Sequence, residues 1–323
     1  MNTFAWLLKR EYWENRGGFF WAPLIAAGVV LLVVTIGVVT GLSHAPLDGR
    51  ALIGGVRISD MAAALTPEQQ QQIGAGLNVG LFFSGAPVAI TLAIVTFFYL
   101  LGSLYDERRD RSILFWKSLP VSDLETVLSK VVAATVIAPL FALAAALALM
   151  VGLLILFSII VSFYGMNPFT LVWANASPLS VVGKIAMLIP LNAIWALPSI
   201  GWLMLCSAFA RRVPFLWATL LPIAAGTCVS IFDAVTNLRI PNDWFWQHIV
   251  GRVLFSVLPG SWMDFDALER RMDHVDGPQV LINAIDMNTI LGPLSGPSIW
   301  IGAAAGIGMI AIAIWLRRWR DDS

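Results

Sequence analysis

The stretch VVAATVIAPLFALAAALALMVGLLILFSIIVSF, residues 131–163, contains no charged residue and no histidine, and the uncharged run continues to residue 183. Similar apolar runs recur at 17–43, 77–105, 185–210, 213–232 and 287–316. A helix or strand at the surface of a water-soluble domain must present polar residues on one face. A bilayer core about 30 Å thick instead requires roughly 20 apolar residues per helix. The chain is therefore predicted to be an all-α integral membrane protein with a single transmembrane domain.

The composition of the 323 residues agrees with this class. Hydrophobic residues make up 58% and charged residues 12%, whereas soluble domains carry roughly 25% charged residues. The net charge is +0, so there is no electrostatic basis for a nucleic-acid partner. Both cysteines, Cys206 and Cys228, fall inside predicted spans, where they cannot form a disulfide framework between external loops.

Six membrane spans are predicted, at about 18–41, 79–104, 131–160, 183–208, 213–235 and 297–316. Dividing 131–163 into two would give segments too short to cross, so one tilted helix with a candidate kink at Pro139 is the better interpretation. With both termini inside, thirteen of the 20 Lys and Arg residues are cytoplasmic, six are outside, and Lys184 lies at the outer edge. This bias follows the positive-inside rule and predicts a multi-pass protein of the inner (plasma) membrane.

Residues 1–16, MNTFAWLLKREYWENR, precede an apolar run that is too long for a cleaved signal peptide. On a helix, Phe4, Leu8 and Tyr12 share one face. The segment is predicted to lie in the cytoplasmic interface, with its tryptophans at headgroup depth. The alternative is an ordinary basic flank of the first span.

Two external segments, 42–78 and 236–296, also carry helix signals. Thr66 is a predicted N-cap, with Gln69 completing a capping box. Residues 244–257 fit a helix that lies on or dips into the outer leaflet and breaks at Pro259-Gly260. We expect re-entrant or interfacial pieces here rather than a further crossing.

The cytoplasmic segment 105–130 is the most informative about function. Charges are concentrated at 106–111, and an apolar patch follows at 113–116. Leu119-Pro120 stops any helix, and Ser122 starts a new one with Glu125 completing a capping box. An exposed apolar patch on such a loop calls for a partner, although packing against the bilayer or a neighbouring helix is the alternative.

This segment resembles the cytoplasmic loop of ABC-2-type transporter permeases, in which a pattern close to E-R-x-x-G-T-L-x-x-L-x-x-x-P-[VI]-S…K follows the second span. The matching residues here are Glu107, Ser112, Ile113, Leu114, Ser118, Leu119, Pro120, Val121, Ser122 and Lys130. Arg111-Ser112 stands where the family usually has Gly-Thr. Leu8-Lys9-Arg10-Glu11 also resembles the family's interfacial elbow helix. The resemblance covers the layout of the whole chain but only about 30 residues in motif.

The resemblance implies the permease subunit of an exporter, powered by a separate ABC ATPase that binds ATP and Mg. A second permease chain, as a homodimer or heterodimer, and membrane lipid are the other implied partners. By resemblance, residues 112–119 form the coupling helix, Pro120, Val121 and Ser122 link it rigidly to the third span, and Glu107 and Arg109 are polar contacts at its edge. The implied ATPase-coupling set is Glu107, Arg109, Ser112, Ile113, Leu114, Phe115, Leu119, Pro120, Val121 and Ser122.

Motifs for chemistry on this chain are missing from the sequence. Neither a G-x-x-x-x-G-K-[ST] phosphate loop nor a H-E-x-x-H or G-x-S-x-G motif occurs, so we expect no enzyme, metal or cofactor site. Two alternatives stay open. One is an ion-coupled secondary transporter or channel, although mid-span acidic residues are scarce. The other is a membrane scaffold that links an ATPase to envelope proteins.

Overall fold

The computed structural model describes residues 3–44, 52–53, 56–57, 66–111, 121–236, 242–262 and 292–319. Within these ranges the chain is helical apart from turns and one short antiparallel pair, β1 (Leu52–Ile53) with β2 (Val56–Arg57). Six of the described helical stretches are long and apolar enough to cross a membrane. The chain is therefore a multi-pass all-α membrane protein, as its sequence predicts.

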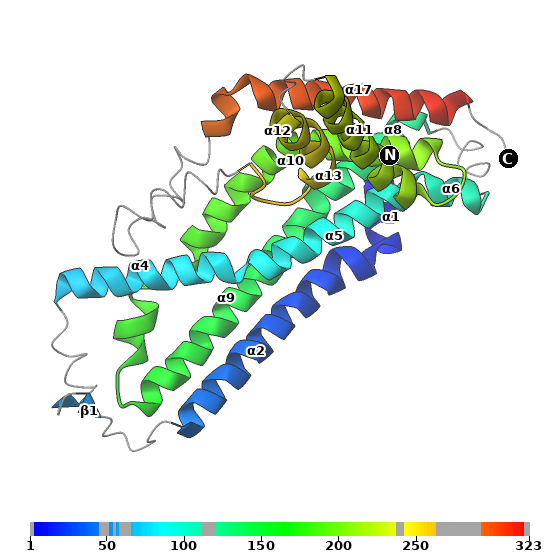
Figure 1. The fold of residues 1–323 in the computed structure, drawn as a ribbon. Coiled ribbons are helices and arrows are strands. Elements are labelled where there is room, and N and C mark those ends of the chain that lie inside the picture. Colours follow the sequence, from blue (N-terminus) through cyan, green and yellow to red (C-terminus); the bar gives the residue numbers. More distant parts are fainter. Residues whose placement is uncertain are drawn as a thin grey trace.

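The helices form one elongated bundle in which the long α2, α5 and α9 run side by side (Figure 1). The first half contains α1 (Thr3–Glu14), η1 (Gly17–Trp21), α2 (Ala22–His44), α4 (Pro67–Ser84), α5 (Ala86–Ser103), α6 (Tyr105–Arg109), α8 (Asp123–Val132), η2 (Ala133–Ile137) and α9 (Ala138–Phe163). The second half contains η3 (Phe169–Trp173), α10 (Pro178–Phe209), α11 (Pro214–Thr236), α12 (Asn242–Phe245), η4 (Trp246–Gly251), α13 (Arg252–Phe255), η5 (Gly292–Ser295) and α17 (Pro297–Trp319).

The second span begins earlier than the sequence predicts. Thr66 caps α4 through the expected capping box with Gln69, and α4 continues through Gly85 into α5. The helical stretch from Glu68 to Arg109 is 42 residues long, about 63 Å at the rise of an α-helix. It exceeds a hydrocarbon core of about 30 Å, so one end must project beyond the bilayer.

The third span is a single helical stretch, as predicted, and runs from Asp123 to Phe163. The π-helical turn η2 interrupts its regular hydrogen bonding immediately before Pro139. Proline cannot donate a backbone hydrogen bond and its ring crowds the preceding turn, and a π-turn relieves such conflicts within a continuing helix. The Pro139 position thus changes the helix type locally without ending the span.

Helices α10 and α17 make the most extensive helix-to-helix contact in the described part of the chain. Gly201 of α10 and Gly306 of α17 bring the two backbones together. A Cβ added to either glycine would meet backbone atoms of the other helix, and at Gly306 it would lie 2.8 Å from the nitrogen of Pro198. Close approach at small residues is the usual basis of helix association in lipid, where apolar burial offers little driving force.

The segment after α11 folds back against the bundle. Val250 of η4 and Val257 are 3% and 6% exposed. Val257 belongs to the same apolar core as Leu203 and Ile310. The chain then turns at Gly260, whose φ is 86°, where the sequence predicts a break.

We predict that Gly306→Ala lowers the stability of the bundle by about 1–3 kcal/mol, because the new methyl group forces α10 and α17 apart. Thermal denaturation of the purified protein in detergent measures this effect. Gly308→Ala on the same helix is the matched control, since nothing lies within 4 Å of a Cβ at Gly308. Equal melting temperatures for the two variants would contradict the proposed close packing.

Candidate functional site

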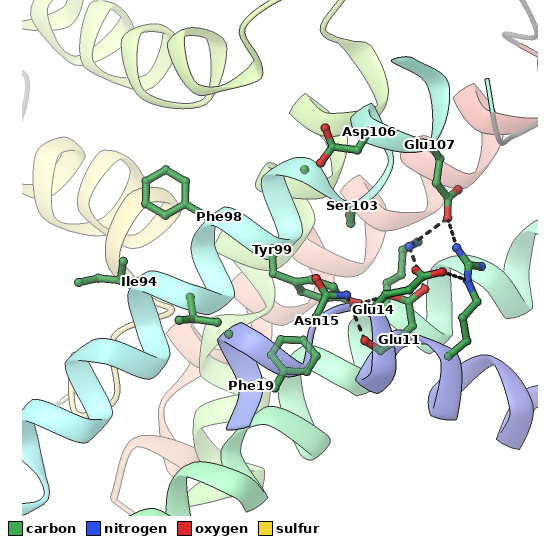
Figure 2. Close-up of a pocket in the computed structure, with 15 residues that line it drawn as sticks. Glu11, Glu14, Asn15, Phe19, Ile94, Phe98, Tyr99, Ser103, Asp106 and Glu107 are labelled. Carbon is green, nitrogen blue, oxygen red and sulfur yellow. Dashed lines mark hydrogen bonds and ion pairs between the residues drawn. The ribbon is translucent and has the colours of Figure 1, made fainter. Parts of the chain in front are cut away.

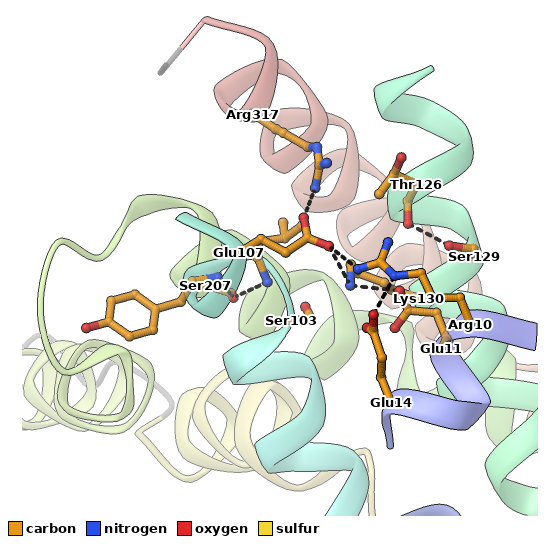
Figure 3. Close-up of polar contacts among 12 residues, drawn as sticks. Arg10, Glu11, Glu14, Ser103, Glu107, Thr126, Ser129, Lys130, Ser207 and Arg317 are labelled. Carbon is orange, nitrogen blue, oxygen red and sulfur yellow. Dashed lines mark hydrogen bonds and ion pairs between the residues drawn. The ribbon is translucent and has the colours of Figure 1, made fainter. Parts of the chain in front are cut away.

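A buried group of charged side chains lies where α1, α6, α8 and α17 meet (Figure 3). We call it the ion network, and its members are Arg10, Glu11, Glu107, Asp123, Lys130 and Arg317. These residues come from both ends and the middle of the sequence. Three carboxylates face three cations in this set, so their formal charges balance.

Lys130 is at the centre of the ion network. Its Nζ lies 2.9 Å from Glu11 Oε1 and 3.1 Å from Glu107 Oε1. The other oxygen of Glu107 accepts a 2.6 Å hydrogen bond from Nη1 of Arg317. Arg317 also donates from Nε to Asp123 Oδ1 at 2.9 Å. Arg10 approaches Glu107 Oε1 from α1 at 3.3 Å.

The central side chains are almost fully removed from solvent. Their exposed fractions are 1% for Glu11, 7% for Glu107, and 4% for both Lys130 and Arg317. Burying charges is costly unless they are paired and hydrogen-bonded, and removal of one partner from such a pair costs about 3–5 kcal/mol. The ion network therefore holds the adjoining ends of α1, α6, α8 and α17 in one arrangement. A charge that left its partner would have neither water nor another counter-ion in this interior.

Local sequence explains how these side chains reach the site. In α8 the Ser122–Glu125 capping box fixes the start of the helix, and Asp123 and Lys130 follow at positions two turns apart. In α1, Leu7 and Glu11 are the buried residues, one turn apart. The buried face of α1 is thus centred on Leu7 and Glu11. Phe4, Leu8 and Tyr12, which the sequence places together on one face, are half-buried.

Two further contacts attach α1 and α6 to the spans. Tyr99 of α5 donates a 2.7 Å hydrogen bond to Glu11 Oε2, and its ring packs edge-on against Phe19. At the end of α10, Ser207 Oγ accepts hydrogen bonds from the backbone N–H groups of Leu104 and Tyr105, each at 3.0 Å. The junction between α5 and α6 is therefore tied both to α1 and to α10.

Arg10 is the most solvated cation of the set, and it also bonds Glu14 at 2.7 Å. Burial lowers the pKa of the Arg10 guanidinium, but the hydrogen bond and charge of Glu14, with Glu11 and Glu107 nearby, raise that pKa above its ordinary value overall. The group is permanently charged, so Arg10 serves the network as a fixed cation.

A pocket of about 490 Å³ lies beside the ion network (Figure 2). Glu11, Glu107 and Lys130 line one part of it, and Ile94, Val95 and Phe98 of α5 line the apolar part. The carboxylate of Asp106 folds back over Gly102, where a Cβ would lie 2.6 Å from Asp106 Oδ2. The pocket therefore places apolar side chains of α5 next to buried charges of the ion network.

The predicted coupling residues fall into four groups in the structure, and the buried Glu107 forms the last of them. Ser112, Ile113, Leu114, Phe115, Leu119 and Pro120 lie outside the described residues. Val121 and Ser122 lie directly before α8, and the predicted capping box of Ser122 with Glu125 is present. Arg109 has a side chain that is 59% exposed and pairs with Asp106 at 3.4 Å and Asp110 at 3.1 Å.

Glu107 is a buried member of the implied coupling set. The family resemblance implies that it is a polar contact at the edge of the coupling helix. In the structure it is buried, and its two oxygens bind cations from α1, α8 and α17. Because its carboxylate already has these internal partners, Glu107 belongs to the ion network within the described part of the chain.

Sequence reasoning did not identify Glu11, Lys130 or Arg317 as site residues. Glu11 carries a usable signal, because an acidic residue one turn after Leu7 lies on an apolar helix face. Lys130 appears in the sequence only as the last residue of the family motif, and Arg317 looks like an ordinary member of the positive-inside set. Only the packing of α8 against α1 and α17 shows that they are buried.

In comparisons with known proteins, no family model, curated protein or solved structure matches the chain. Among the described residues no group of three or more His, Cys, Asp or Glu side chains could hold a metal ion.

We predict that Lys130→Met destabilises the protein by about 3–5 kcal/mol, because it leaves the carboxylates of Glu11 and Glu107 buried without their shared cation. Thermal unfolding in detergent measures the loss. Lys184→Met, at a half-buried lysine of α10, is the control and should melt close to the wild type. Adding Glu11→Gln to Lys130→Met should recover part of the loss, and no recovery would mean that the two residues are not coupled.

Proposed function

We propose that this chain is the membrane-spanning permease subunit of an ATP-binding cassette transporter of the ABC-2 type, located in the inner membrane with both termini in the cytoplasm. A separate ATPase subunit would bind ATP and Mg and supply the energy. Two permease chains, identical or related, would form one export pathway. The motif in 105–130 and the six spans support this proposal.

The observation that carries the proposal is that residues of the ion network flank the segment 112–120 in the sequence. Glu107 precedes this segment and Asp123 and Lys130 follow it, and all three are tied to α1 or α17. A force applied to the segment by a bound ATPase would act on the ends of α1, α6, α8 and α17 together. Such a connection is what converts a cytoplasmic push into movement of spans.

The N-terminal helix supports an elbow role. Helix α1 packs through Leu7 and Glu11 but leaves Trp6 and Trp13 exposed by 56% and 57%. Lys9 lies over the Trp6 ring at 4.8 Å, and Arg16 lies over the Trp13 ring at 5.7 Å. Exposed tryptophans beside cations fit the headgroup region of a bilayer.

We expect the double variant Leu114→Asp with Pro120→Ala to insert and fold normally but to lose its ATPase partner, because it places a charge in the apolar docking patch and removes the rigid link. Co-purification of a Walker-motif ATPase with the wild-type chain and with the variant measures the association. The control is Leu179→Asp, the same change at a 75% exposed leucine at the far end of α10. Normal ATPase binding and transport in the double variant would show that the coupling assignment is wrong.

The same samples separate a transporter from the scaffold alternative. ATP hydrolysis by the purified complex should increase when the transported compound is added, whereas a scaffold has no compound to transport. Movement of a compound driven only by an ion gradient, with no ATPase subunit present, would instead establish the ion-coupled alternative.

The proposed orientation places residue 115 in the cytoplasm. In a Cys228→Ser background, which removes the exposed native cysteine, Phe115→Cys should react with a membrane-impermeant maleimide in inverted vesicles and not in right-side-out vesicles. Cys206 is buried and should add little background. Labelling of Phe115→Cys from the outer side would overturn the topology and, with it, the coupling role.

A further inference from the structure

The segment α12–η4–α13 is attached to α10 by buried polar contacts. The hydroxyl groups of Ser199 and Ser256 are 2.8 Å apart, and the Ser256 N–H donates to Ser199 Oγ at 3.1 Å. Ser199 also bonds the carbonyl of Arg252 at 3.0 Å. Both serines are fully buried, at 0% and 1% exposure. These contacts fix the position of Arg252, the first residue of α13.

The guanidinium group of Arg252 is enclosed on both faces. One face lies 4.3 Å from the ring centroid of Trp195 in α10. The other approaches α17 so closely that a Cβ on Gly302 would lie 2.5 Å from the guanidinium carbon. Nη1 donates to the backbone carbonyl of Ser298. A larger residue at 302 would therefore displace the guanidinium group from this position.

The remaining donor edge of Arg252 has no partner among the described residues. Its Nε and Nη2 atoms are both buried and make no hydrogen bond, and none of the described ion pairs includes Arg252. Arg317, on the same α17 helix that encloses Arg252, binds two carboxylates through Nε and Nη1. A cation in the apolar part of a membrane protein ordinarily has such a partner or marks a functional site.

A second buried polar atom without a partner lies on the adjacent part of α10. The Oδ1 atom of Asn192 is buried and accepts no hydrogen bond. Asn192, Trp195 and Ser199 follow a helical spacing that places them on one face, and Arg252 contacts the latter two. The face of α10 that carries Asn192 is therefore also the face that contacts Arg252.

We propose that Arg252 is the recognition residue of an oxyanion site, which binds a phosphate or carboxylate group through Nε and Nη2, and that Asn192 accepts a hydrogen bond from the same ligand. The Nε and Nη2 hydrogens point in parallel and match two oxygens of such a group. Both nitrogens are covered in this conformation, so Trp195, which is held by a 3.0 Å hydrogen bond to Ser261, shifts when the anion binds.

The site has a direct mechanical connection to the ion network. Ser298 and Gly302 near the start of α17 enclose Arg252, and Arg317 near its end belongs to the network. The two ends are about 30 Å apart along the helix. Occupancy of the oxyanion site therefore acts on the same rigid helix that the network holds. The binding itself requires no ATPase, so this inference stands or fails independently of the proposed function.

The test uses the full-length purified protein in a neutral detergent. Thermal stabilisation is measured during titration with phosphatidylglycerol, with phosphatidylcholine, with inorganic phosphate, and with acetate. Three variants are compared with the wild type: Arg252→Gln, which removes the charge, Arg252→Lys, which keeps the charge and loses the paired donors, and Arg16→Gln. Arg16 is the matched control, because it also lies over a tryptophan ring but is exposed.

We expect at least one anion to stabilise the wild type, with an apparent affinity at least tenfold weaker in Arg252→Gln, intermediate in Arg252→Lys, and unchanged in Arg16→Gln. Stabilisation by phosphatidylglycerol alone identifies a lipid headgroup as the source of the oxyanion, and stabilisation by phosphate or acetate identifies a free small anion. If Arg252→Gln does not purify as a folded protein, the Arg252→Lys titration decides the question. No anion effect on the wild type, or equal effects on the wild type and the folded Arg252 variants, would overturn the proposal and leave Arg252 as a packing residue.

Discussion

The ammonium group of Lys130 lies between the carboxylates of Glu11 and Glu107, and the arrangement of one end of the bundle depends on that contact. The three groups belong to α1, α6 and α8 and are almost inaccessible to solvent. Each would be strongly destabilised there alone, because an ion in an apolar interior loses its hydration. Arg317 extends the same constraint to α17 by binding Glu107 and Asp123. The helices are therefore positioned by electrostatic requirement as well as by shape.

Away from this end, apolar packing sets the fold and small residues set its closest approaches. Gly201 and Gly306 allow the backbones of α10 and α17 to touch, and an alanine-rich face of α9 packs in the core with α2. Large apolar side chains such as Ile25, Val33 and Phe163 remain on the outside. That distribution is expected where lipid is the solvent, since exposure of apolar side chains to hydrocarbon costs nothing.

Two arginines in contact with or on α17, the half-buried Arg252 and the buried Arg317, are in contrasting environments. Arg317 is surrounded by carboxylates, which makes it part of a fixed structural unit. Arg252 lies between Trp195 and Gly302, with part of its donor capacity unused. The carboxylates around Arg317 favour a single conformation of that side chain. The unused donors of Arg252 allow that side chain to bind a further group. A single rigid helix connects them, so the two properties belong to one mechanical element of the protein.

The apolar runs and the capping residues determined much of the local structure by themselves. Six spans, the helix starts at Thr66 and Ser122, and the break at Gly260 follow from hydropathy, capping and turn chemistry, which are local in the sequence. The ion network and the environment of Arg252 do not follow from local rules. Glu11, Glu107, Lys130 and Arg317 are far apart in the chain, and each alone resembles a solvated charge at the end of a helix. Only the packing of α1, α6, α8 and α17 removes them from water, and that removal turns four ordinary charges into one constrained site.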